Sequence, residues 1–286
     1  MGDAHRERQV LRLRDGIATT GVDRVATEEP LEIRLHGRPF AVIMRTPGAD
    51  RELAAGFLLS EGVVRIADDL GTMAYCTDPS PLHPATSAPH HSAPVSSLRN
   101  VINVTLLGCA AADLDRVMHE RRLVAGNASC GLCGRLTIES LQTRVATVTS
   151  ELRVTRETMS AVPGLLRARQ SGFDDTGGLH AACLVGADGI LTTSAEDVGR
   201  HNAVDKVIGR MLMEDALPLS DRVLFVSGRT SFEIVQKAAI AGVPVVGAVS
   251  APSSLAVELA EACGVTLLGF VRDGGFNVYT HAGRIT

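Results

Sequence analysis

The chain has 286 residues, which is long enough for one large domain or two ordinary ones. Hydrophobic residues make up 45% of it and charged residues 21%, as in soluble globular proteins. The formal net charge of -4 argues against broad nucleic-acid binding. The lack of tryptophan argues against aromatic platforms on which the bases of a single strand would stack.

The N-terminal stretch, residues 1–27, shows no clear hydrophobic period, and we expect a frayed lead-in there. It contains no apolar segment typical of a secretory signal, and no apolar run in the sequence approaches the length that spans a bilayer. We therefore expect a cytoplasmic protein that binds neither membranes nor nucleic acid.

The N-terminal half is predicted to be rich in strands. Alternation of apolar and polar residues predicts strands, the first two joined as a hairpin, over 31–35, 40–44, 63–75 and 100–107. Helical spacing predicts helices over 50–60 and 111–123. The segment 77–97 contains five prolines and is expected to be a disordered insertion.

In the C-terminal half, predicted strands alternate with predicted helices. The strands are expected over 179–185, 189–194, 222–227, 243–250, 265–270 and 277–280, the first two as a hairpin and the last at an edge. The helices are expected over 159–169, 204–213, 231–241 and 253–263. This alternation indicates an α/β layer with parallel strands and right-handed crossovers. We therefore expect a strand-rich N-terminal domain, 1–150, and an α/β domain, 151–286.

Two cysteines three positions apart, Cys130 and Cys133, are each followed by glycine. Such a pair could bind a metal, exchange a dithiol for a disulfide, or carry sulfur as a persulfide. Small and polar residues precede it, so we expect an exposed, mobile loop over 126–135. The pair could instead be half of a structural metal site or a chance pair in a turn, and both alternatives stay open. The remaining cysteines are expected to be buried free thiols: Cys76, Cys109, Cys183 and Cys263.

Two loops that follow predicted strands offer groups that bind anions. The first, 227–231, combines Gly228, which permits close approach, with the Arg229 guanidinium, hydroxyl groups and free backbone N–H groups, a set that fits a phosphate. The second, 250–254, lies in the equivalent place one unit later, where its serines could simply cap the next helix. Two adjacent sites of this type suit a ligand with more than one phosphate.

Three further segments place polar groups near the same predicted edge. Residues 196–206 crowd functional groups around a helix start, for which a salt-bridged helix start is the alternative. A glycine turn precedes the strand that begins near His180, and the last core strand ends in a cation and two glycines. We assign these segments to one pocket, whose candidate binding residues are Gly178, His180, Arg200, His201, Asn202, Lys206, Ser227, Gly228, Arg229, Phe270, Val271, Arg272, Asp273, Gly274 and Gly275.

Five motifs together resemble the FdhD family of formate dehydrogenase accessory sulfurtransferases. They are Cys130-Gly-Leu-Cys133-Gly, Gly177-Gly-Leu-His180, residues 197–206, residues 227–237 and Val278-Tyr-Thr-His281. The resemblance runs from about residue 30 to the C-terminus, apart from the 77–97 insertion. It implies a cytidine-deaminase-like α/β fold for the C-terminal domain.

Members of that family take sulfur from a cysteine desulfurase as a persulfide. They pass it to the molybdenum cofactor, bis-molybdopterin guanine dinucleotide, before that cofactor enters formate dehydrogenase. The resemblance makes Cys130 the persulfide carrier, Cys133 an auxiliary thiol and 270–275 a cofactor-binding segment, and a GDP-like nucleotide is expected to fit the same site. It implies a cysteine desulfurase and the catalytic subunit of formate dehydrogenase as partners, with a homodimer as one option and no resident metal.

Three other functions would use some of the same residues. A nucleoside deaminase needs a zinc-binding His or Cys, a nearby Glu and a downstream Cys pair, whereas His180 is followed by two alanines. A zinc-binding or guanine-nucleotide-binding accessory module without transferase activity stays open, because the cysteine pair supplies half of a structural zinc site. A thioredoxin-like oxidoreductase is disfavoured, since no βαβ unit surrounds Cys130.

Overall fold

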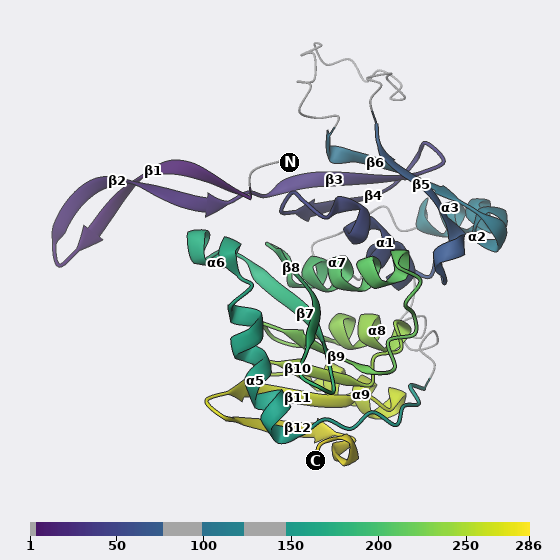
Figure 1. Ribbon diagram of the computed structural model, residues 1–286. Coiled ribbons are helices and arrows are strands. Elements are labelled where there is room, and N and C mark those ends of the chain that lie inside the picture. Colours follow the sequence, from purple (N-terminus) through teal and green to yellow (C-terminus); the bar gives the residue numbers. More distant parts are fainter. Residues whose placement is uncertain (1–3, 77–98, 123–146) are drawn as a thin grey trace, which may run out of the picture.

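The computed structural model describes residues 4–76, 99–122 and 147–286 and contains two sheets, a long ribbon and helices on the sheet faces (Figure 1). Cys130, Cys133, the loop 126–135 and the insertion 77–97 lie outside the described residues. The expectations for those segments therefore stay predictions.

The C-terminal half is built on a six-stranded sheet with the order β12-β11-β10-β9-β7-β8. Its strands are β7 (His180–Gly186), β8 (Leu191–Asp197), β9 (Arg222–Val226), β10 (Val245–Ala248), β11 (Thr266–Arg272) and β12 (Gly275–Thr280). Only β9, β10 and β11 run parallel, while β7 is antiparallel to β8 and β9, and β12 is antiparallel to β11. The expectation of a parallel sheet thus holds for its centre. The outer pairs are hairpins, whose short turns leave no room for a crossover.

Helices cover both faces of this sheet (Figure 1). One face carries α5 (Arg156–Arg167), which packs Met159, Val162 and Leu166 against strand residues such as Phe225, and the short α6 (Ser171–Thr176) follows it. The other face carries α7 (Arg200–Met213), α8 (Phe232–Ile240) and α9 (Ser254–Cys263). The Thr155 hydroxyl caps α5 by accepting the backbone N–H of Thr158 at 3.1 Å, as its sequence position predicts.

The N-terminal half contains a four-stranded sheet with the order β4-β3-β6-β5. Its elements are β3 (Glu29–Leu35), β4 (Arg38–Arg45), α1 (Asp50–Ser60), η1 (Ala67–Asp69), β5 (Leu70–Tyr75), β6 (Val101–Leu106), α2 (Gly108–Ala112) and α3 (Leu114–Arg122). The helix expected over 111–123 is therefore two helices, and the strand expected within 63–75 begins only at Leu70. The buried side chains of this sheet and of α1 belong to the same hydrophobic core as α7, α8 and α9.

The two halves are joined where α1 crosses α7 at very short range. A Cβ atom added to Gly56 would lie 2.0 Å from the backbone oxygen of Asp205, and one added to Gly209 would lie 1.9 Å from that of Glu52. Only glycine permits such an approach. Nearby, Lys237 Nζ lies 2.9 Å from both carboxylate oxygens of Asp205, and both side chains are buried. This ion pair joins α7 to α8, while the close crossing of α1 and α7 joins the two halves.

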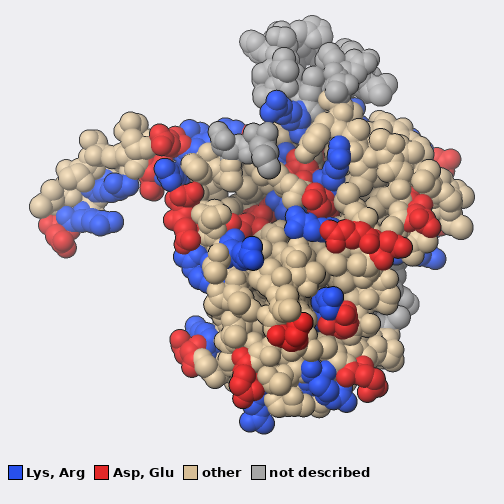
Figure 2. All heavy atoms as spheres, in the orientation of Figure 1, with Lys and Arg blue, Asp and Glu red and all other residues tan. Residues whose placement is uncertain are grey.

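The lead-in is not frayed, contrary to the expectation for residues 1–27. Strands β1 (His5–Arg14) and β2 (Ile17–Ala26) form an antiparallel ribbon that extends away from the body (Figure 1), and Asp15 and Gly16 turn it with positive φ angles of 51° and 76°. Figure 2 shows acidic and basic side chains interspersed along it. Leu11 and Leu13 are 63% and 71% exposed, so no buried face imposes a hydrophobic period.

The four cysteines outside the pair divide into two groups. Cys183 and Cys263 are buried as predicted, but Cys76 is half-buried and Cys109 is exposed. Cys109 lies in the first turn of the five-residue helix α2, which buries only Ala110. Within the described part of the chain, no helix is both long and apolar enough to cross a membrane.

Candidate functional site

One edge of the six-stranded sheet gathers most of the candidate residues. The parallel strands β9, β10 and β11 end there, and the antiparallel strand β7 begins there, since Ala182 pairs with Val226 and His180 pairs with Asp197. Helices α7 and α8 also start at this edge. Loops at the carboxyl ends of parallel strands are the usual place for ligands in such sheets.

The imidazole of His180 and the side chain of Arg200 approach Gly228, and Arg229 follows it in the chain. A Cβ atom added to Gly228 would lie 3.3 Å from His180 Nδ1 and 4.0 Å from Arg200 Cδ. Burial lowers the pKa of His180, and the charges of Arg200 and Arg229 lower it further, so the imidazole is neutral at pH 7. A side chain at position 228 would press against this imidazole, whereas glycine leaves the space beside it free.

Several polar groups at this edge have no partner in the described structure. The Nε atom of Arg200 and the hydroxyl of Thr230 are buried without a hydrogen bond to any described residue. Arg229 is exposed, and its guanidinium forms no ion pair with a described residue. Unpaired buried donors are costly, which makes this edge a candidate for binding a ligand with acceptor oxygens. Thr230 lies within the predicted loop, but its buried hydroxyl could not be recognised from the sequence.

His201 joins the starts of α7 and α8. Its Nε2 lies 2.9 Å from Ser231 Oγ, and its Nδ1 lies 3.4 Å from a carboxylate oxygen of Glu233. Burial lowers the pKa of His201 to about 4, although the Glu233 carboxylate opposes the shift. The ring is therefore neutral at pH 7 and offers one N–H donor.

Backbone hydrogen bonds join the loops after β9 and β10 to each other and to residue Phe270 within β11. The N–H of Thr230 donates to Ala251 O at 3.2 Å, the N–H of Ser253 donates to Thr230 O at 2.9 Å, and the N–H of Phe270 donates to Ser250 O at 3.2 Å. Ser253 caps α9 by accepting the N–H of Ala256 at 3.3 Å. The second loop, 250–254, therefore caps a helix, which is the alternative that its serines suggested.

Two candidates on α7 are already engaged in structural contacts. Lys206 Nζ lies 2.7 Å from a carboxylate oxygen of the fully buried Asp197 and donates to the backbone oxygen of Thr46 at 3.0 Å. Asn202 donates from Nδ2 to Asp197 at 2.8 Å and to the backbone oxygen of Met44 at 2.8 Å. Lys206 and Asn202 therefore fit the alternative expected for residues 196–206, in which these side chains stabilise the start of a helix. They hold the helix that presents Arg200 and His201.

Another glycine candidate, Gly178, lies beside the ribbon. Gly178 is exposed just before β7, and a Cβ atom added to it would lie 3.3 Å from Ala26 Cβ at the end of β2. Arg24 of the ribbon pairs with Asp175 of α6 at 2.8 Å. The ribbon therefore starts from the same edge of the molecule as the cationic loops.

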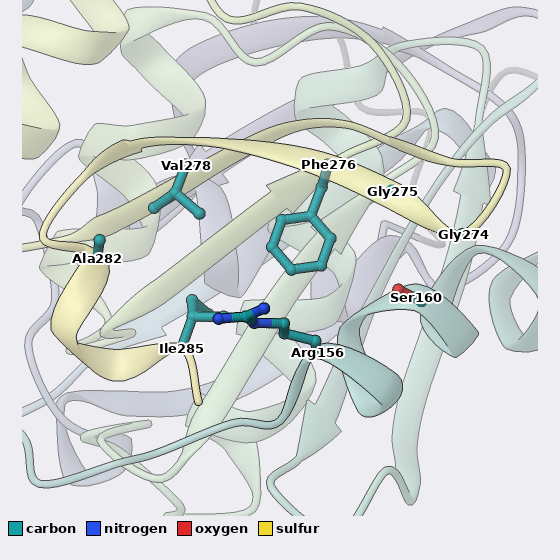
Figure 3. A pocket seen from close by; sticks show the side chains of 8 residues that line it. All are labelled: Arg156, Ser160, Gly274, Gly275, Phe276, Val278, Ala282 and Ile285. Atoms are coloured by element: carbon teal, nitrogen blue, oxygen red, sulfur yellow. The ribbon is translucent and has the colours of Figure 1, made fainter.

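The segment 270–275 is only partly directed toward this edge. Phe270 adopts a positive φ of 55° beside the second loop, Val271 is fully buried, and the exposed Arg272 guanidinium lies 5.7 Å from the Phe270 ring centroid. Asp273 is exposed. The last two candidates, Gly274 and Gly275, line a separate pocket against α5 (Figure 3). The structure thus gives the predicted residues two neighbouring locations rather than one.

Among the described residues, no group of three or more His, Cys, Asp and Glu side chains is placed to hold a metal ion. The charges of Arg200, Arg229 and Asp197 act on the His180 imidazole, and the two arginines disfavour a metal cation there. The cysteine pair lies outside the described residues, so the zinc-binding alternative stays open.

Comparison with known proteins agrees with this architecture. The sulfur carrier protein FdhD of Streptomyces coelicolor (strain ATCC BAA-471 / A3(2) / M145) is 47% identical over 289 residues, covering 100% of this chain and 97% of that protein. The sulfur carrier protein FdhD of Mycobacterium tuberculosis (strain ATCC 25618 / H37Rv) is 46% identical over 289 residues, covering 100% of both. A crystal structure from Desulfotalea psychrophila, provisionally described as a formate dehydrogenase accessory protein, has a TM-score of 0.75 and 23% identity, covering 99% of this chain and 100% of that chain.

The fold and the site define a mixed α/β protein that has a cationic strand edge and carries a smaller strand-rich sheet at its N-terminal side. The predicted fold class is confirmed. A model of the FdhD/NarQ family matches residues 26–286, so the chain belongs to that family.

Proposed function

We propose that this protein is a cytoplasmic sulfur carrier that takes sulfur from a cysteine desulfurase onto Cys130. It delivers that sulfur to bis-molybdopterin guanine dinucleotide for the catalytic subunit of formate dehydrogenase. The observation that carries the proposal is the identity of 46–47% to full-length proteins named sulfur carrier protein FdhD. The cationic strand edge supports it, because the dinucleotide ends of the substrate carry pyrophosphates.

Loading is a thiol exchange at the outer sulfur of a persulfide. The Cys130 thiolate forms a bond to that sulfur, which keeps its proton, while the S–S bond breaks and the desulfurase cysteine leaves as a thiolate. In delivery, the deprotonated persulfide transfers its terminal sulfur to the reduced molybdenum centre, which supplies the two electrons that make it sulfide. Cys130 then returns as a thiolate. Cys133 serves as the auxiliary thiol.

Binding of the cofactor would use the two locations at the strand edge. Arg200 and Arg229 are the cations that can meet a pyrophosphate beside Gly228, where the neutral His180 imidazole also lies. The 270–275 segment comprises the end of β11 and the turn into β12, and β11 lies two strands from β9, which corresponds to about 10 Å at the usual strand spacing. An extended dinucleotide can span that distance.

The test is the intact mass of the full-length chain after incubation with a cysteine desulfurase and cysteine. The wild-type protein should gain one sulfur that a reductant removes, and Cys130→Ala should gain none. Cys109→Ala is the matched control, because Cys109 is an exposed thiol outside the pair. Loading of the Cys130 variant at the wild-type level would refute the assignment.

The alternative is a zinc-binding or guanine-nucleotide-binding accessory module without transferase activity. The same experiment separates the two, since such a module would gain no sulfur. Stoichiometric zinc in the purified protein, lost in both Cys130→Ala and Cys133→Ala, would favour that alternative. Homodimer formation is left open in both cases.

A further inference from the structure

The serine that begins α8 differs from the serine in the equivalent place after the next strand. Ser231 follows β9 and Ser253 follows β10, and each occupies the N-cap position of the helix that comes next. The Ser253 hydroxyl caps its helix by accepting the N–H of Ala256. The Ser231 hydroxyl makes no capping bond and lies 2.9 Å from His201 Nε2 instead. Since an N-cap hydroxyl normally accepts an N–H of the first turn, the contact with His201 needs a different explanation.

A carboxylate fixes the orientation of that histidine. Glu233 Oε2 lies 3.4 Å from His201 Nδ1, and Glu233 Oε1 lies 3.4 Å from Lys237 Nζ. The buried Lys237 is itself held by Asp205 at 2.9 Å, so the Glu233 carboxylate is anchored from below. Because this carboxylate faces Nδ1, it keeps the proton of the neutral imidazole on that atom. Nε2 is then left to accept the hydroxyl proton of Ser231.

A hydroxyl, an imidazole and a carboxylate in series are the groups that activate a serine nucleophile, and they are recognised by geometry rather than by their order in the chain. Two further observations at this turn fit such a site. The N–H groups at the start of the nine-residue helix α8 receive no bond from the Ser231 hydroxyl. The buried hydroxyl of Thr230 has no hydrogen bond to a described residue. Free donors beside a nucleophile can stabilise the negative charge that develops on a carbonyl oxygen.

Two cations beside these residues indicate the class of substrate. Arg229, two residues before Ser231, is exposed and forms no ion pair within the described part of the chain. Arg200 precedes His201, and its buried Nε atom has no hydrogen bond to a described residue. Guanidinium groups in these positions favour a substrate that carries a carboxylate close to its reacting carbonyl group.

We propose that Ser231 is a nucleophile that cleaves carboxylic esters with an anionic acyl group, with His201 as the base and Glu233 as the residue that positions it. This activity goes beyond the proposed sulfur transfer and does not use the cysteine pair. Ser231 Oγ forms a bond to the carbonyl carbon while its proton moves to His201 Nε2. The ester C–O bond then breaks, and the departing alcohol takes that proton. Water attacks the acyl-serine, its proton passes through Nε2 to Ser231 Oγ as the acyl bond breaks, and the carboxylic acid is released.

Labelling of the full-length chain with a fluorophosphonate, which phosphonylates activated serines with loss of fluoride, tests the nucleophile. Peptide masses should place the label on Ser231 and not on Ser253, the matched control that is also an N-cap serine. His201→Gln should lower the labelling rate at least about tenfold, because the base is lost. An unlabelled Ser231 in the wild-type protein, equal labelling of the two serines, or an unchanged rate in His201→Gln would overturn the inference.

Hydrolysis of mono-4-nitrophenyl succinate and of 4-nitrophenyl acetate tests the substrate class. The wild-type kcat/KM should be at least about tenfold higher for the succinate ester, and Arg229→Ala should lose this preference while Arg65→Ala keeps it. Glu233→Gln should lower kcat at least about tenfold with little change in KM, and Glu233→Asp, which keeps the carboxylate, should restore part of it. Equal kcat/KM for the two esters, or an unchanged kcat in Glu233→Gln, would contradict the proposal.

Sulfur loading of Cys130 is read separately by mass, so the two proposals fail independently. A chain that loads sulfur but leaves Ser231 unlabelled would refute only the reactive serine. A chain that gains no sulfur but carries the label on Ser231 would refute only the sulfur-carrier proposal.

Discussion

Replacing Gly56 with alanine tests the contact that joins the two halves of the protein. The added Cβ atom would lie 2.0 Å from the backbone oxygen of Asp205, whereas ordinary contact begins at 3.4 Å. The neighbour is the backbone of α7, so no side chain can rotate away. The two helices would have to separate by about 1.4 Å, which would also move Asp205 relative to Lys237.

The expected loss of stability follows from two opposing effects. Overpacking typically costs about 1–3 kcal/mol, and the upper end applies because the obstacle is backbone. Alanine is favoured over glycine in a helix by about 1 kcal/mol. We therefore expect Gly56→Ala to lower the free energy of unfolding by about 2 kcal/mol.

Urea unfolding followed by circular dichroism measures this loss. The matched control is Gly164→Ala in α5, where an added Cβ atom would meet nothing within 4 Å. That variant should be as stable as the wild-type protein or gain up to about 1 kcal/mol. If Gly56→Ala were equally stabilising, the close crossing of α1 and α7 would be refuted.

Two further predictions concern the strand edge. Burial lowers the pKa of His201 to about 4, against about 6.5 in an unfolded chain, so its contribution to stability is present above about pH 6.5 and is lost as the pH falls toward 4. Between pH 6.5 and 4, the urea midpoint of His201→Gln should therefore fall less than that of the wild-type protein. If the two midpoints fell in parallel as the pH is lowered, the lowered pKa of His201 would be contradicted. Arg229→Ala should weaken GDP binding at least about tenfold, since a charge-assisted contact contributes about 1.5–3 kcal/mol, and Arg65→Ala, at an exposed arginine elsewhere, should not. Unchanged affinity in the Arg229 variant would mean that the 227–231 loop only caps α8.

Local sequence patterns were sufficient where one face of an element is buried. The hairpin β3–β4, helix α1 and the run from β9 to β11 all appear close to their predicted positions, because burial imposes a period on their residues. The ribbon β1–β2 was missed because it buries neither face, and α6 because six residues are too few to show a period. The antiparallel placement of β7 beside β9 depends on long-range pairing that no local window contains.

The same distinction applies to the candidate site. The sequence by itself located the loops after β9 and β10 and the segment after β11, since strands followed by glycine, serine and arginine are recognisable locally. Only the tertiary structure decided which polar groups are free. Lys206 bonds to Thr46, which lies 160 residues earlier, whereas Arg229 has no described partner. Arg156 and Phe276 come from opposite ends of the α/β half and line one pocket. Hydrogen bonds and ion pairs depend on distances between residues far apart in the chain, and the fold alone sets those distances.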